Sequence, residues 1–185
     1  MTEAELIKYL SEPFYADFAD IMARRVSDAG AVGVLYTVVT SPHGELPRSV
    51  RHKVAFRGAY VLEKIYFSGR GLFMPYAEPF CRTDFPACSD ASAQRHFAKV
   101  MADLLGYYTP DPVALDLIAE TAARWAVDPG AKVAVRIWAV DVLKHCRERV
   151  DWVRDVWDDL MEAMSRDATP GIECRMRKSW KASRL

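Results

Sequence analysis

The sequence has neither an excess of one charge nor a long apolar run. Its 25 Lys and Arg side chains balance 25 Asp and Glu side chains, whereas nucleic-acid-binding proteins usually carry a basic surplus. No apolar stretch approaches the roughly 18 residues of a membrane span. The first ten residues, MTEAELIKYL, lack the basic and then apolar pattern of a targeting segment. We therefore expect a soluble, cytoplasmic protein that does not enter a membrane.

The motifs of several common enzyme and metal-site classes are also missing. The chain contains no G-x-G-x-x-G, phosphate loop, H-E-x-x-H or G-x-S-x-G sequence. The four cysteines, Cys81, Cys88, Cys146 and Cys174, include no C-x-x-C pair, so neither a structural zinc site nor a disulfide framework is indicated. His145 is unsuited to activate Cys146, because adjacent helical side chains point about 100° apart. We predict no catalytic residues, no metal and no cofactor.

The length and composition suit one globular domain over residues 1–185. Hydrophobic residues make up 51% of the sequence and charged residues 27%. By area scaling, a chain of this size exposes roughly 30,000 Å² when unfolded and about 9,000 Å² when folded. It can therefore bury a sizeable core without disulfide or metal cross-links.

Glycine and proline divide the chain into segments whose apolar positions recur every three or four residues, as in an amphipathic helix. Asp111 followed by Pro112 has the pattern of an N-cap and first helical residue. The β-branched stretch 31–40 has strand character but no second strand to pair with, so we predict a short buried helix there. Pro75 and Pro79 predict that the helix near 74–83 is kinked or that its start is delayed.

A repeat of about forty residues underlies this pattern. The five residues 53–57, KVAFR, recur at 132–136 as KVAVR, with four of five positions identical. Related arginines stand at positions 57, 95, 136 and 175, and each is expected early in the second helix of a helix pair. Glu173 replaces the alanine that precedes the other three, as a solvent-facing terminal repeat requires. The predicted units are N-terminal helices over 1–29 and helix pairs over 30–68, 71–108, 111–149 and 151–185.

Paired helices at this period resemble the HEAT and armadillo class of repeats. More narrowly, the chain resembles a family of small bacterial HEAT-like proteins, through the segments FRGAYVLEKIY at 56–66, RHFAKVMADLL at 95–105, KVAVRIWAVDVL at 132–143 and PGIECRMRK at 170–178. The resemblance implies an all-α, right-handed superhelix of about four helix pairs with no established activity. Some relatives carry the label adenylosuccinate lyase, but this chain lacks that enzyme's serine-rich signature loop.

The second helices of such a superhelix form its concave face, which is where we place the candidate binding residues. They are Lys53, Phe56, Arg57, Tyr60, Arg95, Lys99, Lys132 and Arg136. Two interpretations of the arginine row compete. In one, each arginine bonds to acidic groups or helix ends of the next repeat. In the other, the row meets an acidic peptide or a phosphate backbone.

A repeat without a catalytic constellation predicts a non-enzymatic scaffold that binds a protein or an extended peptide. The alternative is a nucleic-acid-binding protein related to the HEAT-like glycosylases that remove alkylated bases from DNA. The resemblance would then give Trp138 and Asp141 the roles of those enzymes' concave tryptophan and aspartate. A third hypothesis is a homodimer formed through the apolar segment 31–39.

Overall fold

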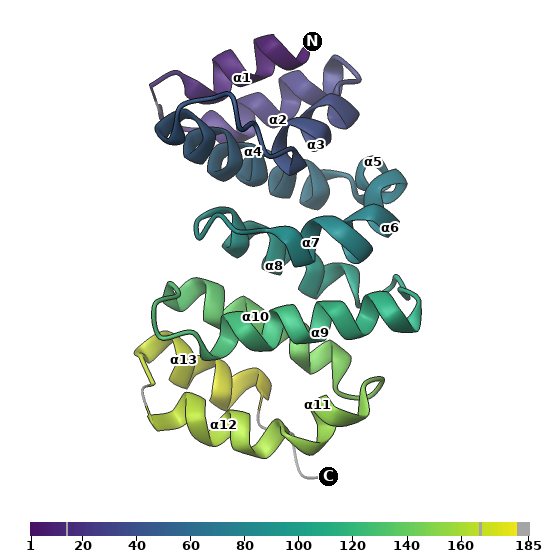
Figure 1. The fold of residues 1–185 in the computed structure, drawn as a ribbon, viewed down its shortest axis with the longest axis vertical. Helices are drawn as coiled ribbons and strands as arrows, with labels where there is room; N and C mark the ends of the chain where they lie inside the picture. The colour runs from purple at the N-terminus through teal and green to yellow at the C-terminus, as the bar shows by residue number, and fades with distance from the viewer. Residues whose placement is uncertain (14, 167, 181–185) are drawn as a thin grey trace.

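The computed structural model describes residues 1–13, 15–166 and 168–180, and within these ranges the chain is built from helices and connecting segments, with no strand. The prediction of an all-α fold is confirmed. Figure 1 shows the helices stacked along the long axis of the molecule, from α1 at one end to α12 and α13 at the other. Among the described residues, no helix combines the length and the apolar character that crossing a membrane requires.

The first half of the chain begins with three short helices followed by one long helix. These are α1 (Glu3–Ser11), α2 (Phe18–Asp28), α3 (Val32–Thr40) and α4 (Arg48–Ser68). A series of short turns then leads to α8. The series comprises α5 (Arg70–Phe73), the 3-10 turn η1 (Met74–Tyr76), α6 (Ala77–Pro79), the π-helical turn η2 (Phe80–Asp84), α7 (Phe85–Ala87) and finally α8 (Ala93–Leu104).

The second half repeats the arrangement of long helices and ends in shorter ones. It comprises α9 (Pro112–Val127), α10 (Val133–Cys146), α11 (Asp151–Asp155), α12 (Trp157–Arg166), α13 (Pro170–Arg175) and the π-helical turn η3 (Met176–Trp180).

Local signals in the sequence explain where several of these helices begin and break. The Asp111 carboxylate caps α9 by accepting hydrogen bonds from the backbone N–H groups of Val113 and Ala114, at 3.1 and 3.2 Å. The helix expected near 74–83 is broken into short pieces around Pro75 and Pro79, since each proline removes a backbone donor. The capping and proline predictions are both confirmed.

The β-branched segment 31–40 is helical, as predicted, because its side chains are buried against other helices rather than paired in a sheet. Leu35 and Val38 of α3 are buried completely or nearly so. The hypothesis of a homodimer through this segment required its apolar side chains to be exposed, and that premise is wrong. The apolar residues of α3 are already covered inside the chain.

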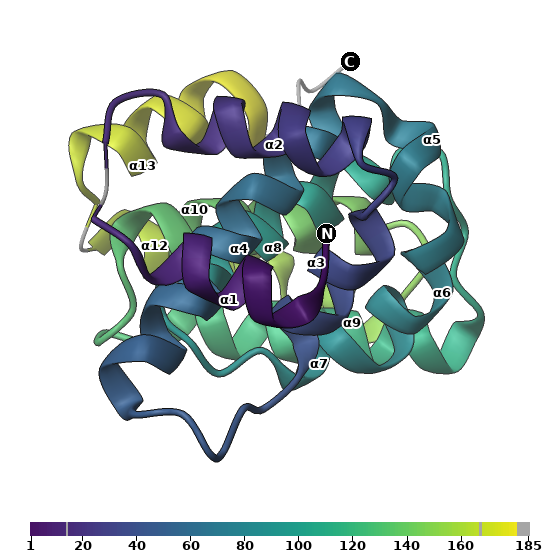
Figure 2. The same cartoon turned by 90° about the horizontal axis from the view of Figure 1, so that it is seen from above.

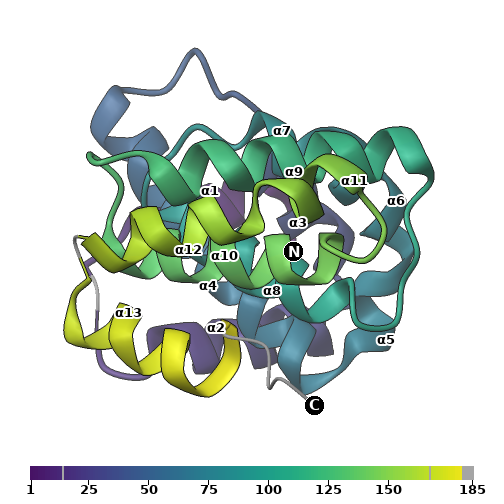
Figure 3. The ribbon, with the colours of Figure 1, turned by 90° about the horizontal axis from the view of Figure 1, so that it is seen from below.

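Helices α4, α8 and α10 form a central layer that runs through the molecule. Helix α4 packs against α8, α8 against α10, and α10 against α13. Figures 2 and 3 show α7 and α9 on one side of this layer and α2 and α13 on the other. The core is one continuous cluster from Leu6 to Trp180.

Aromatic rings fasten the short turns between α4 and α8. Tyr66, Phe73, Phe80 and Phe97 form an edge-to-face chain, with successive ring centres 5.2, 5.2 and 5.0 Å apart. Such pairs add stability beyond the area that they bury. This chain holds α5 and η2 against the central layer, although no continuous helix joins them.

The four related arginines do not occupy equivalent places in their helices. The prediction that each lies early in its helix is wrong for Arg57, since α4 begins at Arg48, and for Arg175, the last residue of α13.

Helix α4 packs closely against α3 and α1 at Gly58. A Cβ at this position would stand 2.5 Å from Cγ2 of Val39 and 3.4 Å from Cδ1 of Leu10. We expect Gly58→Ala to lower the free energy of unfolding by about 1–3 kcal/mol, because overpacking outweighs the helix-propensity gain of about 1 kcal/mol. Urea denaturation measures the difference.

Gly71→Ala is the matched control, since Gly71 also lies in a helix but has no atom within 4 Å of an added Cβ. It should leave stability unchanged or raise it by up to about 1 kcal/mol. A Gly58→Ala protein as stable as the wild type would contradict the packing of α4 against α3.

Candidate binding groove

A groove lies where α4, α8, α10 and α13 meet. Seven of the residues around its hollow of about 290 Å³ come from five elements. They are Phe67 of α4, Lys99 and Asp103 of α8, Trp138 and Lys144 of α10, Arg175 of α13 and Ser179 of η3. We call this surface the groove.

The packing of α8 decides which of its residues face the groove. Most of this helix is buried between α4 and α10, including Phe97, Val100 and Met101. A narrow strip stays accessible, with Arg95 exposed and Lys99 and Asp103 half-buried. These positions are four apart, so they lie on one face of the helix.

Trp138 is the centre of the groove. The guanidinium carbon of Arg175 lies 4.8 Å from the centre of its ring, and the Lys99 ammonium lies 5.9 Å from it. Lys99 also lies 4.7 Å from the centre of the Phe67 ring. Cations within about 6 Å of an aromatic ring are attracted to its face. The groove therefore presents two cations held over half-buried or exposed aromatic surface.

A buried carboxylate behind the groove holds Arg175 in place. Asp141 is 7% exposed, and its Oδ1 accepts a hydrogen bond of 2.7 Å from the indole N–H of Trp180. Its Oδ2 lies 3.4 Å from Nη1 of Arg175 and accepts no hydrogen bond from the described residues. Asp141 is thus covered by Trp180 of η3 and Arg175 of α13, which supply the partners that a buried aspartate needs.

A second buried carboxylate holds Lys99. Oε2 of Glu63 lies 2.6 Å from Nδ1 of His96, and Oε1 accepts a hydrogen bond of 2.5 Å from Nζ of Lys99. Burial alone would raise the pKa of Glu63, but these hydrogen bonds and charges lower it below its ordinary value of 4.5. Tyr60 stacks on the His96 ring, with centres 4.8 Å apart. The network joins α4 to α8 and fixes the direction of Lys99.

Two of the residues predicted to bind a partner are engaged in packing. Arg57 is buried and donates hydrogen bonds to the carbonyls of Leu10 and Glu12, where α1 ends. Arg136 donates a hydrogen bond of 3.0 Å to the carbonyl of Ala126, in the last turn of α9. Carbonyls at helix C-termini have no hydrogen-bond donor within the helix. Both arginines supply the donors that these carbonyl oxygens would otherwise lack.

The structure brings other predicted residues together near the groove. Tyr60 stacks on His96 and the Phe56 ring lies tilted against it, and His96 is bonded to the carboxylate that holds Lys99. Arg95 is exposed one helical turn before Lys99.

The two remaining predicted residues lie near the helix starts. Lys53 is exposed in the second turn of α4, and Lys132 donates a hydrogen bond of 2.8 Å to the hydroxyl of Ser92, just before α8. Lys132 therefore links the start of α10 to the start of α8.

Sequence reasoning missed Glu63, His96, Phe67 and Lys144. One signal could have found the first two. Each is a charged or polar residue among apolar residues of a buried helix face, and such residues are rarely buried without a partner.

Neither a family model, nor a curated protein, nor a solved structure matches the chain. What the groove can bind is therefore argued from its residues.

The cysteines and potential metal ligands give no second candidate. Burial raises the pKa of the Cys81, Cys88 and Cys146 thiols to about 12, which keeps them protonated. Within the described ranges, no group of three or more His, Cys, Asp or Glu side chains is placed to hold a metal ion.

The Glu63 network predicts a loss of stability in acid. Because the folded pKa of Glu63 lies below its unfolded value, its contribution is present above about pH 4.5 and is lost as the pH falls through the folded pKa. Glu63→Gln should flatten this dependence and cost about 3 kcal/mol at pH 7, since it breaks a buried pair. Urea denaturation between pH 3 and 7 measures both effects.

Glu162→Gln is the control, because Glu162 is exposed and pairs only with Arg166 on the surface of α12. It should leave the pH dependence of the free energy of unfolding unchanged. At pH 7 it should alter that free energy by no more than about 0.5 kcal/mol. Equal pH slopes for wild type and Glu63→Gln would show that this carboxylate does not titrate as the geometry requires.

Proposed function

We propose that this protein is a non-enzymatic scaffold that binds an extended, acidic peptide segment of a partner protein in the groove. The observation that carries the proposal is the position of Trp138, with Arg175 and Lys99 over its ring in a hollow open to solvent. Buried aromatic and arginine side chains are the residues on which protein interfaces most often depend.

The accessible charge in the groove is positive, although the whole chain is neutral. Glu63 and Asp141 are buried and face Lys99 and Arg175 from behind. The third carboxylate, Asp103, accepts two hydrogen bonds of 3.0 Å from Arg70. Arg95 and Lys144 remain exposed beside them. A carboxylate of a partner would therefore meet cations that are more exposed than their own acidic partners, Glu63 and Asp141.

The shape of the surface favours an extended chain over a compact ligand. Two aromatic side chains line it, Phe67 of α4 and Trp138 of α10, and Phe56 and Tyr60 are half-buried in earlier turns of α4. Figure 1 shows α2 towards the N-terminal end of the stack and α13 towards the C-terminal end. A peptide laid across α4, α8 and α10 would alternate apolar contacts with rings and ionic contacts with Arg95, Lys99 and Lys144.

Single-stranded nucleic acid is the second candidate, because rings interleaved with cations also suit stacked bases and phosphates. The balance of 25 basic and 25 acidic residues favours the peptide. The position of Asp141 also favours it, since Trp180 and Arg175 cover the carboxylate that a base-excising enzyme of this kind would need exposed.

The experiment selects linear peptides displayed on phage against the full chain and measures the enriched sequences by calorimetry. We expect enrichment of Asp and Glu spaced among apolar residues. Reversing two exposed groove cations, in Arg95→Glu with Lys144→Glu, should weaken the selected peptides tenfold or more, because it replaces attraction by repulsion.

The matched control, Arg154→Glu with Arg166→Glu, makes the same change of net charge on α11 and α12, away from the groove. It should leave the affinity within twofold. Selected peptides without acidic residues, or equal losses in both double variants, would contradict the proposal. Tight binding of a single-stranded oligonucleotide that Arg95→Glu with Lys144→Glu abolishes, with no peptide enriched, would replace it by the second candidate.

A further inference from the structure

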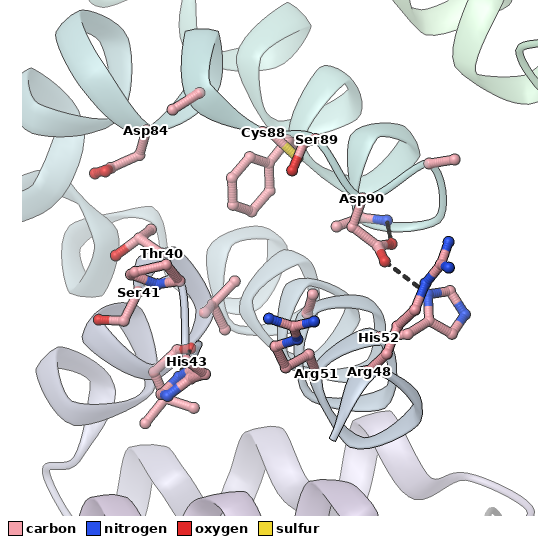
Figure 4. Close-up of a pocket in the computed structure, with 18 residues that line it drawn as sticks. Thr40, Ser41, His43, Arg48, Arg51, His52, Asp84, Cys88, Ser89 and Asp90 are labelled. Atoms are coloured by element: carbon pink, nitrogen blue, oxygen red, sulfur yellow. Dashed lines mark hydrogen bonds and ion pairs between the residues drawn. The ribbon is translucent and has the colours of Figure 1, made fainter. Parts of the chain in front are cut away.

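A larger cavity of about 920 Å³ lies at the edge of the stack, on different residues from the groove. Three segments surround it, as Figure 4 shows: the end of α3 with the loop that follows it, the first turns of α4, and the stretch from Asp84 to Ala93. Its volume falls within the range of about 300–1,000 Å³ that is usual for small-molecule sites.

The loop wall of this cavity is fixed by a buried histidine. Nε2 of His43 lies 2.7 Å from the carbonyl oxygen of Val38, and the residue is 7% exposed. Its backbone adopts φ 44°, in the left-handed region that non-glycine residues rarely occupy. A side chain and backbone held in this way give the loop a definite shape, so the cavity is formed before any ligand arrives.

The two acidic side chains in the wall already have partners. Asp84 accepts a hydrogen bond from the hydroxyl of Tyr36. Asp90 lies 2.6 Å from Nδ1 of His52, and its other oxygen accepts two backbone hydrogen bonds of 2.9 Å at the start of α8. The Asp90 carboxylate is therefore fully occupied, and the Asp84 carboxylate is held by Tyr36 but keeps its negative charge.

The two arginines in the wall have no such partners. Arg48 is exposed and Arg51 is half-buried, and neither guanidinium makes a hydrogen bond or ion pair with another residue of the described chain. Figure 4 shows Arg51 near the middle of the cavity, facing the Asp84–Asp90 stretch. Two guanidinium groups in this cavity are therefore left without a hydrogen-bond or ion-pair partner among the described residues.

The remaining walls combine apolar surface with free hydroxyl groups. Val38, Val39 and Phe97 supply buried apolar surface. Ser41 and Ser89 add hydroxyls that no other described residue engages. An occupant of matching chemistry would have an apolar body and an anionic head group.

We propose that this cavity binds a small organic anion, with a phosphate or carboxylate group held by Arg48 and Arg51 and an apolar body against Val39 and Phe97. Guanidinium groups bind the oxygens of either anion in pairs, which gives both affinity and direction. The site is independent of the groove, so each can fail without the other.

The experiment titrates the full, isotopically labelled chain with phenyl phosphate and with benzoate and follows backbone amide signals by NMR. Phenol serves as the neutral probe. We expect both anions to shift signals from the three cavity segments, while phenol shifts them at least tenfold more weakly. Arg48→Gln with Arg51→Gln should reduce the affinity for the anions tenfold or more, with the rest of the spectrum unchanged.

Two further variants separate a formed cavity from a diffuse positive surface. Arg24→Gln removes an exposed arginine of α2 that likewise has no partner, and it should leave the affinity unchanged. Ser89→Trp keeps every charge but adds a bulky ring at the cavity wall, and it should reduce the affinity tenfold or more.

Tighter binding of phenyl phosphate would identify a phosphate ligand, and tighter binding of benzoate a carboxylate; both support the site. Three results would overturn it: phenol binding as tightly as the anions, full affinity in Arg48→Gln with Arg51→Gln, or full affinity in Ser89→Trp. Inorganic phosphate binding as tightly as phenyl phosphate would also overturn it, because the apolar wall would then contribute nothing.

Discussion

The structure depends on the burial of α8 between α4 and α10. A single helix pair cannot cover its own apolar face, so each pair needs the next one. Helix α8 meets neighbours on both sides, and its residues Phe97, Ala98 and Met101 are almost wholly inaccessible. One narrow strip is left over, at Arg95, Lys99 and Asp103, and this strip forms part of the groove.

The same burial forces polar groups into the interfaces between helices, where each needs a partner from another element. Arg57 finds carbonyls at the end of α1, Glu63 finds His96 and Lys99 on α8, and Asp141 finds Trp180 and Arg175 at the end of the stack. The cations of the groove are therefore oriented by carboxylates that stabilise the stack. Binding surface and packing are supplied by the same side chains.

The two candidate sites use different parts of this architecture. The groove lies on the long helices, so its geometry follows from their regular packing. The cavity at the edge depends on irregular chain: the loop after α3 and the short turns that Pro75 and Pro79 impose before α8. Connections of this kind commonly carry binding residues on a rigid scaffold. Here the aromatic chain from Tyr66 to Phe97 supplies the rigidity.

The sequence by itself determined the helical fold, the helix over 32–40, the cap at Asp111 and the break near Pro75, because periodicity, capping and proline geometry act within a few residues. The repeat spacing also located Lys99 and Arg95, but it could not separate them from Arg57 and Arg136. All four are cations at similar places in the pattern. Only the tertiary structure showed that two of them meet the open carbonyls at helix ends, while Arg95 stays in solvent and Lys99 lies over two aromatic rings.

The tertiary structure alone likewise decided which residues pair with Glu63 and that the Arg51 guanidinium has no partner among the described residues. His96 is 33 residues from Glu63, and the segment around Asp84 lies as far from Arg51 in the sequence. Whether such groups meet depends on the distances between packed helices and on the path of the loops. A local pattern fixes which face of a helix is apolar, but the neighbour that covers this face, and the charges that it brings, follow from how the helices stack.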